Sequence, residues 1–362
     1  MLSRCTRTYL GLGLLGMMLF LSVGTLRMKT DNRLELWQTE DPAAIRYRAF
    51  VREYGGDSFL LIAYTGSTLF GAHALDVQAE VFDGLTEIQG VQSVLGVPRI
   101  FLELFGGEDP EALQVEMLRN PMYQNFLVSE DGSTLGMLLV TKPGLNSRAV
   151  ARILHETETV IAPLREIADG VSLVGPPVLN DALNTLSGRE AARTFPMAVV
   201  SSMVLLLLLL RSWRIVLVIA LCAGLSVGAI MGLMGFLDVP LNMITAALPA
   251  LLWVLALANA VHPVYAFRQA HALGHNAAAA AEIAFARTAR PCLVAAMTSA
   301  AGFLSLCGAS LQPVRELGFF AASGMVAIAL ATLLVAPLLL ARLNCRPPAS
   351  DSKGFNPWDG FR

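Results

Sequence analysis

Apolar residues gather in six blocks along the chain, with one long polar interval after the first block. The blocks cover residues 9–26, 195–210, 215–237, 243–264, 291–310 and 317–340. A helix needs about 20 apolar residues to cross a bilayer. The second block reaches this length only if Thr194, Phe195 and Pro196 begin its helix. The pattern predicts an α-helical polytopic membrane protein with six transmembrane helices.

The long interval, residues 27–194, has the alternation and periodicity of a water-soluble α+β domain. Two similar strand–helix–strand successions occur in it, punctuated by Gly90, Pro98 and Gly175. We expect strands at 58–65, 91–97, 134–141 and 171–174, and helices at 73–89 and 147–167. This matching order predicts a domain made of two βαβ-like units. A last helix from Leu179 is expected to run into the second span.

Basic residues concentrate on one side of the spans. They are Arg4, Arg7, Arg211, Arg214, Arg268, Arg287, Arg290, Arg342 and Arg346. Because Lys and Arg in short loops stay preferentially in the cytoplasm, both termini are expected there. The predicted order is a cytoplasmic N-terminus (1–8), a first span (9–26), an extracytoplasmic domain (27–194), a five-helix membrane domain (195–343) and a cytoplasmic polar tail (344–362). The expected location is the plasma (inner) membrane.

The first span also has features of a signal peptide, with Arg4 and Arg7 as its basic region. Its apolar stretch is longer than the core of a signal peptide, and Ser22 to Thr25 is a poor cleavage site. These features favour a retained membrane anchor.

Composition agrees with the membrane assignment. The chain is 55% hydrophobic and 15% charged, and its mean hydropathy is +0.58, which is too apolar for one water-soluble core. The five cysteines lie in spans or on the cytoplasmic side, so no disulfide framework is expected. No glycine-rich phosphate loop or nucleophilic triad is recognisable. We therefore expect no enzyme, no ATP site, no cofactor and no nucleic-acid partner.

Two histidines, His271 and His275, stand four residues apart in an alanine-rich cytoplasmic segment. This spacing suits a metal, but no third ligand lies nearby, and a solvated helix face is favoured. No metal site is predicted.

A few polar residues interrupt the apolar spans and are candidates for function. Asn259 and His262 are three residues apart, so they share one helix face. Such a pair serves either a proton or substrate pathway or hydrogen bonds between helices. Thr298 and Ser299 complete a polar cluster with Asn259, or bond to carbonyls one turn back. Small residues predict close helix packing, at Gly224, Gly228, Gly232 and Gly302.

The order of several motifs makes a family resemblance specific. The motifs are Tyr47-Arg48-Ala49-Phe50, Gly175-Pro176-Pro177, Leu241-Asn242-Met243-Ile244-Thr245, Arg290-Pro291, Thr298-Ser299-Ala300-Ala301-Gly302 and Leu317-Gly318. The chain resembles one half of a transporter of the resistance-nodulation-division superfamily, in its MMPL and Patched-like, sterol-sensing-domain branch. The resemblance implies that residues 27–194 form a porter-like domain.

In this family the fourth span commonly carries an acid in a pattern like Gly-Ile-Ala-Asp-Ala-Val-His, which is thought to exchange the protons that drive transport. The matching segment here runs from Ala256 to His262, and Asn259 takes the place of the acid. An amide has no proton to exchange near neutral pH, so the usual relay is lost at this position. His262 titrates near neutral pH and offers a residual relay. Interhelical hydrogen bonding is the favoured alternative.

The resemblance implies a half-transporter that exports hydrophobic or amphiphilic, lipid-like molecules. It needs a second half, either another copy of the chain in a homodimer or a separately encoded partner. The competing hypothesis is a non-transporting membrane protein that binds a lipid or regulates a partner and has lost proton coupling.

Overall fold

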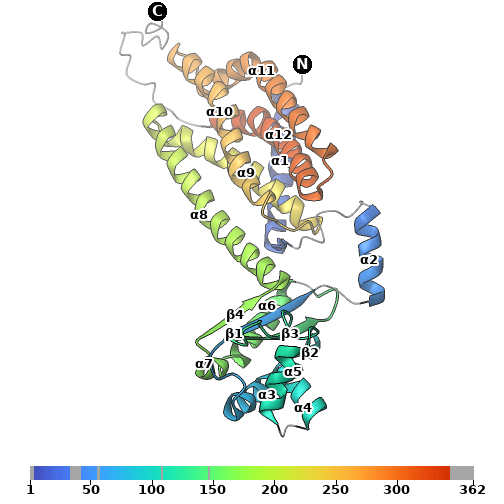
Figure 1. Cartoon of the computed structure of the whole chain (residues 1–362). Helices are drawn as coiled ribbons and strands as arrows, with labels where there is room; N and C mark the ends of the chain where they lie inside the picture. The colour runs from blue at the N-terminus through green and yellow to red at the C-terminus, as the bar shows by residue number, and fades with distance from the viewer. Residues whose placement is uncertain (1–3, 33–41, 55–57, 107–108, 146, 343–362) are drawn as a thin grey trace, which may run out of the picture. The chain divides into compact units, whose positions relative to one another are not determined.

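The computed structural model describes residues 4–32, 42–54, 58–106, 109–145 and 147–342. The chain divides into two compact units (Figure 1). The membrane unit comprises Met1–Asp31 and Ser187–Arg362, and the sheet unit comprises Asn32–Leu186. The predicted boundaries, 26/27 and 194/195, differ from these divisions by five and eight residues, respectively.

Six helical segments of the described chain are long and apolar enough to cross a membrane, which confirms the predicted spans. They are Thr8–Arg27, Pro176–Leu210, Trp213–Phe236, Thr245–Ala272, Ala277–Gly308 and Gln312–Ala341. Their helices are α1 (Arg4–Val23), α8 (Pro176–Leu210), α9 (Trp213–Phe236), α10 (Leu248–Ala272), α11 (Ala277–Leu304) and α12 (Gln312–Leu330). A π-helical turn, Ala331–Val335, and α13 (Ala336–Ala341) complete the sixth span. Helices are the expected solution, because hydrocarbon leaves no other partner for the backbone.

The spans differ in how far the unit buries them. Of the 18 consecutive residues that are most apolar in each span, 67% are buried in α9, but only 17% in the span of α11 and 11% in that of α8. Helix α9 therefore forms the centre of the bundle and packs against α1, α10 and α12. Helices α8 and α11 keep most of their surface available to lipid or to another protein.

The sheet unit holds one four-stranded sheet, in the order β2-β3-β1-β4. The strands are β1 (Phe59–Thr65), β2 (Val91–Leu95), β3 (Thr134–Thr141) and β4 (Gly170–Val174), and each neighbouring pair is antiparallel. The helices are α2 (Pro42–Tyr54), α3 (Ala72–Glu87), α4 (Val97–Phe105), α5 (Pro110–Arg119), α6 (Ser147–Val160) and α7 (Leu164–Ile167).

Both predicted strand–helix–strand units are present in chain order, but they do not form separate sheets. Strand β3 lies between β1 and β2, and β1 lies between β3 and β4. The result is the split βαβ arrangement called ferredoxin-like. Two strands bury too little surface to be stable alone, so interleaving the units gives a single sheet and a single core. The predicted second helix, 147–167, is also divided into α6 and α7.

The core of the sheet unit lies on one face of the sheet. Leu60, Ile62 and Tyr64 of β1 are fully buried there, in one cluster with residues of α3 and α6. The Tyr64 hydroxyl donates to Gln78 Oε1 at 2.8 Å, and Gln78 Nε2 donates to the Leu69 carbonyl at 2.7 Å. Burial raises the pKa of Tyr64 well above its usual value, so the hydroxyl keeps its proton as a donor.

Candidate functional site

Asn259 lies half-buried on α10, where that helix packs against α11. Its Nδ2 is 3.4 Å from the Leu255 carbonyl one turn back, which is a long hydrogen bond. The Asn259 backbone carbonyl faces Cys292 of α11, with 4.0 Å between the oxygen and Sγ. The amide side chain thus has donor and acceptor capacity left for a further partner.

His262 lies one turn further along α10 and is exposed on the surface of the membrane unit. In the described part of the chain, no hydrogen bond to its ring is found. An exposed polar ring in a hydrocarbon-length helix is costly unless it meets water or another protein group.

Among the described residues, neither Thr298 nor Ser299 of α11 makes a hydrogen bond to Asn259. Cys292 is level with Asn259, and Thr298 comes six residues later, about 9 Å along the helix axis. Thr298 Oγ1 donates back to the Val294 and Ala295 carbonyls, at 3.0 and 2.9 Å. The described residues thus show the local bonding for Thr298 and no direct link to Asn259.

The glycines of α9 meet two different neighbours. A Cβ on Gly232 would collide with the Leu21 carbonyl of the first span, and one on Gly228 would lie 2.7 Å from Ser22 Oγ. Gly224 instead faces Trp253 of α10, at 4.0 Å. A Cβ on Gly302 of α11 would meet no atom within 4 Å.

A polar network that the sequence did not reveal joins the turn before α10 to the start of α12. Asn242 is only 4% exposed, and its Oδ1 accepts from the backbone nitrogens of Ile244 and Thr245, at 3.0 and 2.9 Å. Its Nδ2 donates to Glu316 Oε2 at 3.4 Å, and Gln312 Nε2 donates to Glu316 Oε1 at 2.8 Å. The Asn-x-x-Thr spacing was a usable signal for the cap, whereas Glu316 is 74 residues away and gave none.

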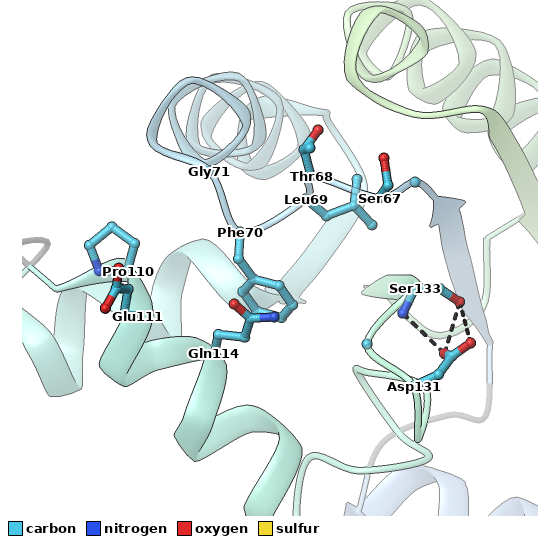
Figure 2. Close-up of a pocket in the computed structure, with 12 residues that line it drawn as sticks. Ser67, Thr68, Leu69, Phe70, Gly71, Pro110, Glu111, Gln114, Asp131 and Ser133 are labelled. Carbon is cyan, nitrogen blue, oxygen red and sulfur yellow. Dashed lines mark hydrogen bonds between the residues drawn. The ribbon is translucent and has the colours of Figure 1, made fainter.

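A cavity of about 400 Å³ opens in the sheet unit, between the loop after β1, the start of α5 and the turn before β3 (Figure 2). Its polar side chains are those of Ser67, Thr68, Glu111, Gln114, Asp131 and Ser133, and Phe70 and Pro110 supply apolar surface. Its lining contains two carboxylates and no basic side chain. Such a cavity suits hydroxyl or amino groups and disfavours phosphate.

Asp131 is held in its turn by hydrogen bonds. Its Oδ1 accepts from the Ser129 hydroxyl at 2.6 Å, and from the Ser133 nitrogen and hydroxyl at 3.0 and 2.8 Å. The Ser129 hydroxyl and the Ser133 donors lower the pKa of Asp131 to about 2. The carboxylate at the cavity edge is therefore charged at any physiological pH.

No group of three His, Cys, Asp or Glu side chains has the geometry of a metal site within the described ranges. His271 Nδ1 lies 2.9 Å from the His275 carbonyl, an arrangement that turns this ring nitrogen to the backbone.

Two known proteins have sequences related to most of this chain. A membrane protein of Methanocaldococcus jannaschii is 22% identical over 356 residues, which cover 92% of this chain and 91% of that protein. The hopanoid transporter HpnN of Rhodopseudomonas palustris is 28% identical over 284 residues, which cover 76% of this chain but only 30% of HpnN. The profile of the MMPL family matches residues 59–358, from the first strand of the sheet through all five later spans. This chain belongs to the MMPL family.

Proposed function

We propose that this chain is one half of a transporter that exports hydrophobic or amphiphilic, lipid-like molecules. The observation that carries the proposal is the family match, which runs without interruption through the sheet unit and five spans. The name of HpnN, a hopanoid transporter, supports a lipid-like substrate. The chain corresponds to 30% of HpnN, so the activity of that whole protein is extended here only as part of the proposal.

The exposed surface of the membrane unit is consistent with a second half that packs against it. Helix α11 is largely unburied, and it presents Thr298 as an exposed polar side chain. Exposed His262 lies on neighbouring α10. Polar groups in spans generally face a bundle interior or a water-filled cavity rather than lipid. A copy of this chain, or a separately encoded half, would cover these two helices.

A non-transporting, lipid-binding or regulatory protein is the second candidate, and Asn259 is the observation that favours it. The site has an amide where the family resemblance places the proton-exchanging acid. If transport is coupled to protons, the relay must use another group, and His262 is the nearest titratable side chain on that helix face.

Transport is tested with the full chain, and any partner that co-purifies with it, in proteoliposomes carrying a fluorescent sterol-like lipid. We expect an outward-acid pH gradient to accelerate transfer of the lipid to acceptor vesicles. His262→Gln separates the two roles open to this ring, because it abolishes the acceleration if His262 relays protons and leaves it unchanged if His262 only bonds between helices. His155→Gln in the sheet unit is the matched control. No transfer above protein-free vesicles would reject the transporter and leave the lipid-binding candidate. Gradient-driven transfer that His262→Gln does not change would exclude His262 as the relay.

A further inference from the structure

The two central strands of the sheet unit are apolar on both faces. Strand β1 reads Phe-Leu-Leu-Ile-Ala-Tyr-Thr and β3 reads Thr-Leu-Gly-Met-Leu-Leu-Val-Thr. Antiparallel strands with one face in water normally alternate apolar and polar residues. Near-continuous apolar strands are typical of sheets that are covered on both faces. In the sheet unit the core cluster, with residues of α3 and α6, lies on one face of the sheet.

The opposite face, here called the open face, carries one apolar row across all four strands. The strand registers place Leu95 of β2 opposite Leu138 of β3, Leu138 opposite Leu61 of β1, and Leu61 opposite Val174 of β4. Leu95 is 37% exposed and Val174 is 53% exposed. Among the described residues, none of the four belongs to the core cluster or packs against it. Figure 1 shows the four strands in this order.

A second, shorter row strengthens the patch. Phe59, which is 37% exposed, pairs with Val140 one step along the same face. None of the four strands contains a charged residue. A neutral, flat and apolar surface fits another surface of the same kind and does not attract an ionic ligand.

We propose that the open face packs against the open face of a second copy of this chain, about a two-fold axis. An isologous contact requires a self-complementary patch, and an uncharged row centred on the two middle strands meets this requirement. Sheets packed face to face lie about 10 Å apart, with side chains interdigitated. The inference rests on the proposed function, since it takes the second half to be an identical chain.

The area of the open face indicates how much it contributes to the stability of a dimer. Four strands and five residues along each cover about 19 Å by about 17 Å, or roughly 320 Å² per copy. Stable interfaces bury about 800 Å² per partner. The open face therefore aligns two copies that also meet within the membrane, rather than holding a dimer together by itself.

The test is disulfide and thiol cross-linking of full-length chains in their membrane. Leu138→Cys lies in the apolar row, and Leu102→Cys on α4, which is 69% exposed, is the matched control. We expect the row cysteine to give a covalent dimer at least tenfold faster than the control. Equal rates at the two positions would overturn the proposal.

A charge variant separates a true interface from random collision. Val174→Lys places a cation at the exposed end of the row, and Val115→Lys on α5, 59% exposed, is its control. We expect Val174→Lys to reduce cross-linking through Leu138→Cys at least fivefold while Val115→Lys leaves it unchanged. Protection of Leu138→Cys from thiol reagents in a monomeric chain would also overturn the proposal, because the chain itself would then cover the face.

The lipid-transfer assay in proteoliposomes, applied to the same variants, distinguishes a failure of this inference from a failure of the proposed function. Cross-linking at the open face without lipid transfer supports the interface and rejects the transporter. Lipid transfer by chains that never cross-link there supports the transporter and rejects the interface.

Discussion

At the residue scale, two glycines in membrane spans, Gly232 and Gly302, have different surroundings. Gly232 and Gly302 read alike in the sequence, as small residues in spans. In the structure, a Cβ on Gly232 would collide with a backbone carbonyl of the first span, whereas one on Gly302 would meet nothing within 4 Å. A backbone carbonyl cannot rotate away as a side chain can, so a Cβ at Gly232 would require the whole helix to shift. Gly232 therefore tolerates a larger residue far less well than Gly302 does.

Gly232→Ala is therefore expected to destabilise the purified protein by about 1–3 kcal/mol, the usual cost of overpacking. The measurement is thermal unfolding in detergent, followed by the exposure of buried Cys222 to a thiol-reactive dye. Gly302→Ala is the matched control and should unfold at the temperature of the unmodified chain. Equal effects of the two substitutions would contradict the close contact between the first span and α9.

At the element scale, a buried asparagine holds the turn that leads into α10. Asn242 Oδ1 accepts from two backbone nitrogens of that turn, and its amide reaches Glu316 at the start of α12. Asn276 makes a comparable cap for α11, accepting from Ala279 N at 2.8 Å, but it is exposed to solvent. Loss of a cap leaves backbone donors without a partner, which is more costly where water has no access.

We expect Asn242→Ala to lower stability by about 1–2 kcal/mol, the upper part of the range for helix caps. Asn276→Ala should cost a smaller amount because water replaces its carbonyl oxygen. Both variants are compared by the same dye-exposure melting curve. A larger effect for Asn276→Ala would show that the Asn242 network is not a structural anchor.

At the scale of the whole molecule, the arrangement across the membrane follows from the basic loops. The positive-inside pattern predicts the sheet unit outside the cytoplasm, and the connection between α10 and α11 inside it. Met122 in the sheet unit and Leu273 in that connection are each 75% exposed, so they form a matched pair of labelling sites.

A membrane-impermeant maleimide applied to intact cells is expected to label Met122→Cys at once, and Leu273→Cys only after the membrane is permeabilised. The reverse pattern would place the sheet unit in the cytoplasm and contradict an extracytoplasmic porter-like domain.

The sequence alone determined the six spans, because a run of about 20 apolar residues in hydrocarbon has little alternative to a helix. It also predicted the succession of strands and helices around Gly90 and Gly175, since periodicity and turn residues act over short distances. The family motifs predicted the MMPL family, and the match of its profile to residues 59–358 confirms it.

Only the tertiary structure decided which of these parts are neighbours. The place of β3 between β1 and β2, the pairing of Asn242 with Glu316, and the contact of Gly232 with the first span all join residues far apart in the chain. The same is true of the row from Leu95 to Val174, which exists only because four separate strands share one register. Strand pairing and helix packing are non-local choices, set by the burial of whole faces, and no local pattern of residues encodes them.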